Sequence, residues 1–228
     1  MNKRGNDAYA KREARVRELG RAYAEAVLAG DEVAAELVIR RAMTARLTTP
    51  EIDDEIIAPA LWLVGELWER GDITVADEHL ATEISIRVLA LHGEARRTAG
   101  ARPKHRILLA TPSGELHSVA LRMAELLLRE AGYTVVMLGP DVPPHALAIK
   151  ARQLAPDLVC LSATMPGGGD RILIAMHEIT RACPNMRFVI GGRGVTGRVR
   201  AQPGIEVCGR VSDVVEAADA LVKRADLN

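Results

Sequence analysis

Apolar residues recur every three to four positions through the first hundred residues, which is the spacing of helices packed on one face. Helix start and stop signals divide this region into segments at residues 11–29, 31–47, 49–71 and 74–97. Short turns separate the four segments. The pattern therefore predicts an antiparallel bundle of four helices.

Polar residues mark the expected helix starts. Asp31 suits the N-cap of the second helix, and Thr49 followed by Pro50 suits the start of the third. Thr74 and Asp77 form a variant of the capping box at the start of the fourth. These signals agree with the apolar periodicity on where the helices begin.

The spacing of apolar residues along the chain changes beyond residue 105. Short apolar runs, typical of buried strands, occupy residues 106–111, 134–138, 158–162, 188–191 and 206–208. Helical patterns lie between most of them, at residues 117–131, 144–154, 170–182 and 212–224. Strands alternating with helices predict a parallel sheet covered on both faces, in a flavodoxin-like (Rossmann-like) doubly wound fold.

The change of period also predicts the domain organisation. The expected parts are a polar tail at 1–10, a helical bundle at 11–98, a linker at 99–104 and an α/β domain at 105–228. Thirty basic and thirty acidic residues cancel, so no direct contact with nucleic acid is expected. No signal peptide and no run of 18 apolar residues is present, so we expect a cytoplasmic protein without a membrane span.

Polar residues and glycines follow three of the expected strands, where ligands bind in open α/β sheets. They are Glu115, His117 and Ser118 after the first strand, Ser162, Thr164 and Gly167 after the third, and Gly191 and Gly192 after the fourth. A neutral imidazole suits a metal, and a nearby carboxylate can accept its other N–H and fix the tautomer. The alternative is that His117 begins a helix and the glycines make turns.

The motifs Glu115-x-His117-x-x-Ala120, Ser162-x-Thr164 and Gly191-Gly192 resemble the cobalamin (vitamin B12)-binding domain family, in order and placement, over roughly residues 105–225. The resemblance implies that His117 is the lower axial ligand of cobalt and that Glu115 orients it. It also implies that the nucleotide tail of cobalamin lies beside the serines, Thr164 and the glycines. The family pattern has Asp and Gly where this chain has Glu115 and Ala120. These departures change the reach of the carboxylate and add a methyl group, but they leave the ligand in place.

In the helical half, Trp68 is followed after nine residues by Glu78-His79. This spacing resembles cobalamin-dependent light sensors of the CarH type. The resemblance implies that Trp68 packs against the upper ligand, with Val75, Glu78 and His79 bordering the same pocket. The alternatives are that Trp68 belongs to the bundle core and that the acid–histidine pair is a solvated first turn.

Two neighbouring residues refine this expectation. Trp62 lies about 120° round the helix from Trp68, so we expect Trp62 in the core and Trp68 at the cofactor. Some of these sensors have a histidine directly after the tryptophan, whereas this chain has Glu69. That position therefore cannot supply an upper ligand after photolysis, and His79 becomes the candidate.

The leading functional hypothesis is a light-responsive cobalamin sensor without enzymatic activity, holding adenosylcobalamin in the dark. A DNA-binding domain like that of the CarH type is expected to be missing. The sensor is therefore expected to act on transcription through a partner protein, such as a transcription factor, or through self-association. The main alternative is a corrinoid methyl carrier of a methyltransferase system, which would use methylcobalamin. A further alternative is an antirepressor or carrier that binds hydroxocobalamin.

Overall fold

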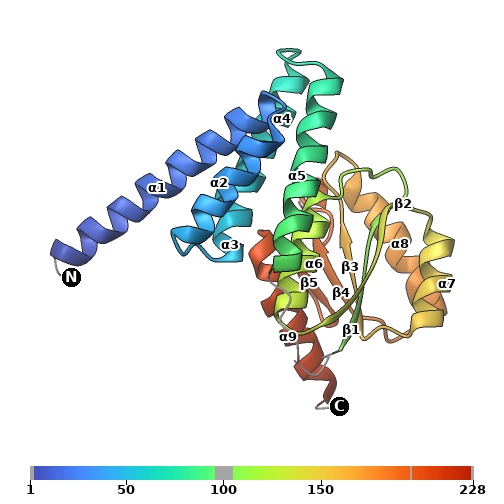
Figure 1. Cartoon of the computed structure of the whole chain (residues 1–228). Coiled ribbons are helices and arrows are strands. Elements are labelled where there is room, and N and C mark those ends of the chain that lie inside the picture. Colours follow the sequence, from blue (N-terminus) through green and yellow to red (C-terminus); the bar gives the residue numbers. More distant parts are fainter. Residues whose placement is uncertain (1–2, 96–104, 196, 227–228) are drawn as a thin grey trace. The chain divides into compact units, whose positions relative to one another are not determined.

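The computed structural model describes residues 3–95, 105–195 and 197–226. The chain divides into two compact units, Met1–Ala95 and Arg96–Asn228. The first unit is helical and the second is α/β (Figure 1). This order confirms the predicted fold class.

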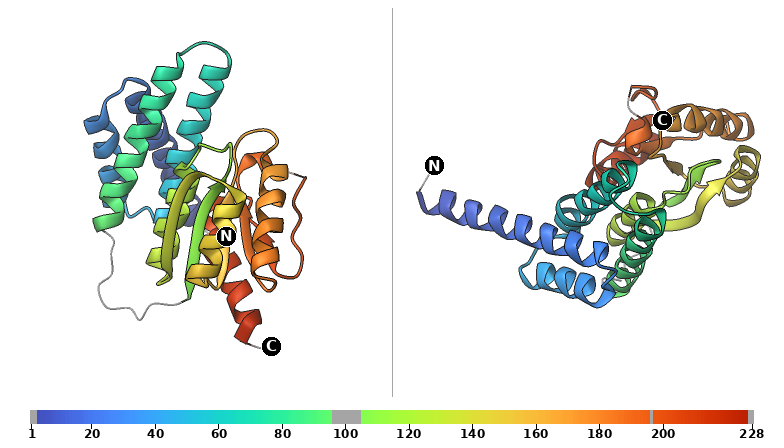
Figure 2. Two further views of the ribbon diagram at one scale, coloured as in Figure 1. Left: turned by 90° about the vertical axis from the view of Figure 1, so that its right-hand side faces the viewer. Right: turned by 90° about the horizontal axis from the view of Figure 1, so that it is seen from above.

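The first unit follows the predicted helices with two differences. Its elements are α1 (Lys3–Leu28), α2 (Glu32–Thr44), α3 (Thr49–Ile52), the π-helical turn η1 (Asp53–Ile57), α4 (Ala58–Glu69) and α5 (Val75–Ala95). Helix α1 already begins at Lys3, so most of the expected polar tail is helical, and its N-terminal part projects beyond α2 (Figure 2). The expected linker at 99–104 lies outside the described residues.

The second difference is that the expected third helix is interrupted by η1. In this turn the amide of Ala58 donates to the carbonyl of Asp53, five residues earlier. Pro59 follows directly and has no N–H to donate, so a wide turn at this point accommodates it within a continuing helical path. The helix thus keeps its direction through a proline that would otherwise break its hydrogen bonds.

The predicted caps are confirmed at two of three helix starts. The Asp31 carboxylate accepts from the amide of Ala34 at 2.9 Å, and Asp77 accepts from the amide of Thr74 at 2.8 Å. At the third start, the cap is Thr48 rather than Thr49. The Thr48 amide donates to the Glu51 carboxylate at 2.8 Å, and the Thr48 hydroxyl accepts from the Glu51 amide.

The prediction that Trp62 belongs to the core is wrong, because its surface is 49% exposed. The buried stripe of this helical stretch instead runs through Ile56, Ala60 and Val64 at four-residue spacing. Trp62 follows Ala60 by two residues, or about 200° round the helix, and therefore lies away from that stripe. Within the core, the Tyr23 hydroxyl donates to the Ser85 hydroxyl at 3.0 Å.

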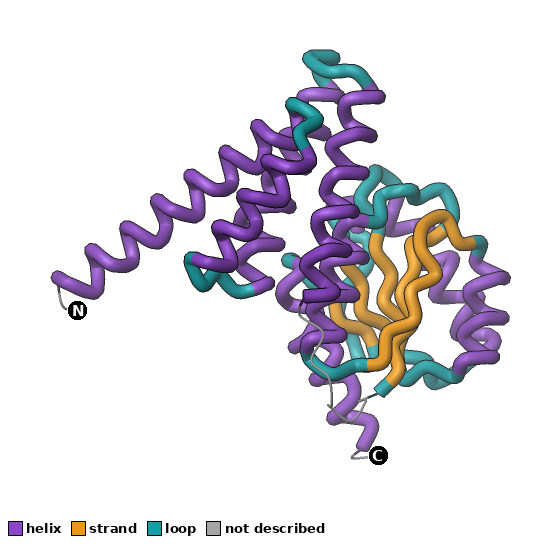
Figure 3. The backbone as a smooth tube through the Cα atoms, viewed as in Figure 1, coloured by secondary structure: helices purple, strands orange, loops and turns teal. Residues whose placement is uncertain are grey.

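Within the described residues, the second unit is built on a five-stranded parallel sheet (Figure 3). The strands are β1 (Arg106–Pro112), β2 (Thr134–Val142), β3 (Leu158–Ser162), β4 (Phe188–Gly191) and β5 (Ile205–Val207), in the order β2-β1-β3-β4-β5. Helices α6 (Val119–Glu130) and α9 (Val214–Asp226) pack on one face, and α7 (Pro144–Leu154) and α8 (Gly168–Ala182) pack on the other. This is the predicted flavodoxin-like arrangement, with its switch point between β1 and β3.

Strand β2 continues four residues beyond the predicted end at Leu138. Its pairing with β1 shifts register at Ala110 and again before Pro112, where β2 contains extra residues. The bulges coincide with positive φ angles at Gly139 (92°) and Asp141 (54°). Pro140 is tolerated here because β2 is an edge strand. The Gly-Pro pair that suggests a strand end therefore forms a bulge instead.

Candidate functional site

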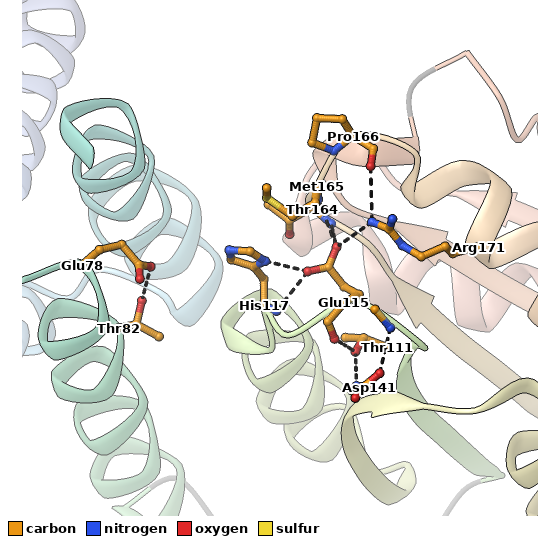
Figure 4. Close-up of polar contacts among 11 residues, drawn as sticks. Glu78, Thr82, Thr111, Glu115, His117, Asp141, Thr164, Met165, Pro166 and Arg171 are labelled. Atoms are coloured by element: carbon orange, nitrogen blue, oxygen red, sulfur yellow. Dashed lines mark hydrogen bonds and ion pairs between the residues drawn. The ribbon is translucent and has the colours of Figure 1, made fainter. Parts of the chain in front are cut away.

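The centre of the site is the carboxylate of Glu115, whose side chain has no exposed surface. Its Oε1 atom accepts from Nδ1 of His117 at 2.6 Å and from the His117 amide at 3.0 Å. Its Oε2 atom accepts from the amides of Thr164 and Met165 at 2.7 and 3.0 Å (Figure 4). The loops that follow β1 and β3 are therefore joined through one buried side chain at the switch point of the sheet.

These hydrogen bonds determine the charge of Glu115. Burial alone would raise its pKa, but the bonds from the His117 ring and from the backbone amides outweigh burial and lower the pKa to about 2. Glu115 is therefore an anion at neutral pH. In a neutral imidazole, an anionic acceptor holds the proton on Nδ1 of His117 and leaves the lone pair on Nε2. The imidazole side chain itself is 43% exposed, so it is presented at the surface of this unit.

A cation completes the surroundings of this carboxylate. Nη2 of Arg171, from the first turn of α8, lies 3.8 Å from Oε2 of Glu115 and donates to the carbonyl of Pro166 at 3.4 Å. Its guanidinium also lies beside the position that a side chain at Gly167 would occupy. Arg171 therefore ties the β3–α8 loop to the buried carboxylate.

The backbone of Glu115 is held from the opposite side. Its carbonyl accepts from the Thr111 hydroxyl at 2.5 Å and from the Asp141 amide at 3.0 Å. The Asp141 carboxylate in turn accepts from the Gly114 amide at 2.7 Å and from the Ser113 hydroxyl at 3.2 Å. The ends of β1 and β2 thus brace the loop that carries His117.

The sequence did not single out Asp141 or Arg171. Asp141 had a usable signal, because it lies at the carboxyl end of β2, at the same edge of the sheet as the other site residues. The bulge obscures this signal, because the apolar run that predicts the strand ends already at Leu138. Arg171 had no signal, because an arginine in a first helical turn is ordinary.

The structure brings the remaining α/β residues to the same edge. Ser162, the last residue of β3, is buried and pairs in register with Gly191 of β4. Ser118 is buried at the N-cap position of α6 without a capping hydrogen bond from its side chain. Gly167 begins α8 with φ at 76°. Thr164 takes part in the site through its backbone amide.

The two glycines after β4 differ in what they require. A side chain at Gly192 would meet the Ala163 carbonyl oxygen at 2.2 Å, and its φ of 100° is unfavourable for other residues. Gly192 is therefore needed for packing of the chain on itself. At Gly191 the nearest atom is Cβ of Cys208 at 4.0 Å, so the space beside it is open to a ligand.

The residues predicted in the helical unit lie together at its α4–α5 end. Trp68, in the last turn of α4, is 38% exposed, and Val75 and His79 are exposed in the first turn of α5. The Glu78 carboxylate contacts Nδ1 of His79. It also accepts from the Thr82 hydroxyl at 3.1 Å (Figure 4). The four residues therefore share one end of the helical unit, and their contact with a cofactor stays a prediction.

The site offers a single oriented imidazole, which suits a metal whose other ligands belong to a cofactor. Within the described parts of the chain, no cluster of three or more His, Cys, Asp or Glu side chains could hold a metal ion. A cofactor such as cobalamin would bring the other ligands of its cobalt with it, so the single oriented imidazole of His117 would suffice to hold the metal from the protein side. Also among the described residues, no helix has the length and apolar character needed to cross a membrane.

The fold and the site thus define a flavodoxin-like domain that presents one oriented imidazole at its switch point, preceded by a helical unit. Residues 105–219 match the B12 binding domain family, and residues 19–91 match a second B12 binding domain family. The chain belongs to the B12-binding family and is a cobalamin-binding protein.

Two groups of relatives are similar to this chain. The chain is 32% identical to the HTH-type transcriptional repressor CarA of Myxococcus xanthus, over 76% of this chain and 57% of the repressor. It is 35% identical to the HTH-type transcriptional repressor CarH of the same organism, over 58% of this chain and 43% of that protein. The chain thus spans about half the length of these two relatives.

The second group contains corrinoid proteins named after methylamines. Trimethylamine corrinoid protein 2 of Methanosarcina acetivorans is 27% identical over 85% of this chain and 91% of its own length. The monomethylamine corrinoid protein of Methanosarcina barkeri has the same fold, with a TM-score of 0.72, 16% identity, and coverage of 90% of this chain and 98% of that one. The relatives therefore divide between regulators and corrinoid proteins.

Proposed function

We propose that this protein is a light-responsive cobalamin sensor without enzymatic activity, with adenosylcobalamin as its dark-state cofactor. The observation that carries the proposal is the exposed group at the α4–α5 end, formed by Trp68, Val75 and the Glu78–His79 pair. A large aromatic side chain with 38% of its surface exposed, at the same end of the helical unit as an oriented imidazole, suits contact with an apolar and partly polar ligand. The similarity to two transcriptional repressors supports a regulatory role.

In this proposal residues of both units contribute to cobalamin binding. His117 would bind cobalt through Nε2, because Glu115 keeps the proton on Nδ1. Ser162 and Gly191, adjacent in the sheet, would border the nucleotide tail. Trp68 would pack against the upper ligand, and the Glu78 carboxylate would hold the His79 ring beside it. Bound adenosylcobalamin would supply a cobalt–carbon bond that light can break.

Loss of the upper group would remove the contact surface of Trp68 and so change the balance between two states of the protein. Such a ligand-controlled equilibrium responds only to the difference in contacts between the two states. The output would be a change of self-association or of binding to a partner protein that acts on transcription. His79, rather than Glu69, is the side chain proposed to approach cobalt after photolysis.

The test is to load the full chain with adenosylcobalamin in darkness and record visible spectra and size-exclusion profiles before and after illumination. We expect a spectral change accompanied by a change in assembly. Trp68→Ala should weaken the assembly change, whereas Trp62→Ala, at another exposed position of the same helix, should leave it intact. A spectral change with unaltered assembly and unaltered partner binding counts against the sensor.

A second function, a methyl carrier of a methyltransferase system, is favoured by one observation. The similarity to trimethylamine corrinoid protein 2 spans nearly the whole of that protein. A carrier would bind methylcobalamin through the same His117 and would leave the upper face accessible. Tight binding of methylcobalamin, with transfer of its methyl group to a thiol in the presence of a methyltransferase, would identify the carrier. Tight binding of hydroxocobalamin alone, without a light response, would identify the third alternative, an antirepressor or passive carrier.

A further inference from the structure

Asp141 has an unusual backbone for its place in the fold. Among the described residues, three non-glycine residues have positive φ angles, namely Arg46, Asp141 and Ala155. Arg46 and Ala155 stand directly after helices α2 and α7, where a left-handed residue is a common way to end a helix. Asp141 instead lies inside strand β2, where no helix end accounts for it. A strained residue inside a strand suggests that its side chain or backbone is needed in that orientation.

The contacts of Asp141 show what the orientation achieves. The bulge in β2 turns its carboxylate toward the β1–α6 loop, 27 residues earlier in the chain, where it accepts from the Gly114 amide at 2.7 Å. The same carboxylate oxygen accepts from the Ser113 hydroxyl at 3.2 Å. The Asp141 amide, turned the other way, donates to the Thr111 hydroxyl and to the Glu115 carbonyl, both at 3.0 Å.

The carboxylate and the backbone amide of Asp141 therefore both hold the β1–α6 loop at Glu115. The carboxylate fixes the residue that precedes Glu115, and the amide fixes the carbonyl of Glu115 itself. The Glu115 side chain is anchored separately by the Thr164 and Met165 amides. With its backbone and its side chain both fixed, Glu115 has one position from which to hold the His117 ring (Figure 4).

We propose that Asp141 is a positioning residue, which holds the Glu115–His117 pair in the geometry that ligates cobalt. The proposal rests on the proposed role of His117 as lower ligand. Asp141 itself acts only through the loop, since its carboxylate and its amide form hydrogen bonds with residues 111–115. Its effect should therefore appear in how completely His117 is bound to cobalt and in the order of the loop, not in whether the chain folds.

Asp141→Gly separates these effects. Glycine adopts a positive φ without strain, and this relief offsets part of the cost of the lost hydrogen bonds, so the variant should still fold although it lacks the acceptor for Ser113 and Gly114. Asp141→Asn is the rescue variant, because asparagine tolerates the left-handed conformation and keeps one acceptor oxygen for the Gly114 amide. Ala155→Gly is the matched control, because it relieves the same kind of backbone strain after α7 and leaves the loop untouched.

The first measurement uses the full chain with 15N-labelled histidine, loaded with hydroxocobalamin and then reduced. It scores histidine ligation by the 15N doublet splitting in the electron paramagnetic resonance spectrum, which the unlabelled base of the cofactor cannot give. We expect full ligation in the wild type, Asp141→Asn and Ala155→Gly, and none in His117→Ala. In Asp141→Gly the equilibrium constant for ligation should fall about 5-fold or more, the effect of losing a hydrogen bond. Equal ligation in Asp141→Gly and in the wild type would overturn the proposal.

The second measurement needs no cofactor and follows hydrogen exchange of the His117 amide, which donates to Glu115. Exchange should be about 5-fold faster or more in Asp141→Gly and unchanged in Ala155→Gly. Unchanged exchange in Asp141→Gly would overturn the proposal on its own. If His117→Ala keeps the wild-type spectrum, the lower-ligand assignment fails instead, and the exchange result still decides whether Asp141 orders the loop.

Discussion

Nδ1 of His117 lies 2.6 Å from Oε1 of Glu115, a carboxylate that is completely buried and also accepts two backbone amides through its other oxygen. Glutamate thus occupies the place that aspartate has in the family pattern, and its extra methylene group lengthens the reach of the carboxylate. The longer side chain reaches His117 and the β3–α8 loop at once. This relationship accounts for one departure from the family pattern and leads to the first two predictions.

Glu115→Gln should weaken both the fold and the cofactor site. An amide nitrogen would face the N–H groups of Thr164 or Met165, leaving buried donors without an acceptor at a cost of about 3 kcal/mol. Cofactor affinity should fall about 10- to 100-fold, as for other residues that orient a metal ligand. Urea unfolding and a visible titration with hydroxocobalamin measure the two effects. Glu216→Gln, an exposed change on α9, should alter neither.

Glu115→Asp tests the use of the longer side chain. It keeps the charge but is too short to reach both sets of donors, so we expect an affinity between those of the wild type and Glu115→Gln. An aspartate variant with wild-type affinity and stability would show that the bonds to the β3–α8 loop contribute little.

The stability of the protein should depend on pH through Glu115. Its pKa is lowered from 4.5 to about 2 in the folded chain, so the ionised group stabilises the fold above pH 4.5. That contribution, on the order of 3 kcal/mol, should be lost as the pH falls from 4.5 toward 2. The difference in free energy of unfolding between the wild type and Glu115→Gln, measured by urea unfolding at several pH values, should shrink over this window. A difference that stays constant from pH 5 to pH 3 would contradict the assignment.

Arg171→Met should destabilise the α/β unit by about 2 kcal/mol, because the buried Glu115 anion loses a neighbouring cation and the Pro166 carbonyl loses a donor. The matched control is Arg181→Met on the same helix, where the arginine pairs with Glu178 at the surface. Its cost should be below about 0.5 kcal/mol. Thermal or urea unfolding of the two variants decides the matter, and equal stability would argue that Arg171 has no special role.

Gly191→Ala and Gly192→Ala should separate ligand binding from folding. Gly192→Ala should cost about 3 kcal/mol or more, because the added methyl group meets the Ala163 carbonyl and φ is positive. Gly191→Ala has room and should change stability by less than about 1 kcal/mol. If the nucleotide tail lies beside Gly191, the same change should lower cofactor affinity about 10-fold. Wild-type affinity in Gly191→Ala would place the tail elsewhere.

Much of the site was predictable because its residues follow strands, and the carboxyl ends of parallel strands meet at one edge. This rule predicts from the sequence alone that His117, Ser162 and Gly191 lie at the same edge of the sheet. It could not assign Gly192, since only the close approach of Ala163 shows that this glycine serves packing. It also failed for Trp62, because helical spacing relates two residues to each other without saying which side faces the core.

The sequence by itself determined the two units, the order of secondary structure and the family, because periodicity and strand-end motifs are local properties of the chain. Only the tertiary structure decided that Glu115 is a buried anion shared by two loops, and that Asp141 and Arg171 support it. Those contacts join residues 26 to 56 positions apart. The bulge in β2 and the packing of α8 determine which residues meet in these contacts, and no local pattern in the sequence specifies either one. The class of the protein can therefore be inferred from its sequence, whereas the geometry of its site follows only from the tertiary structure.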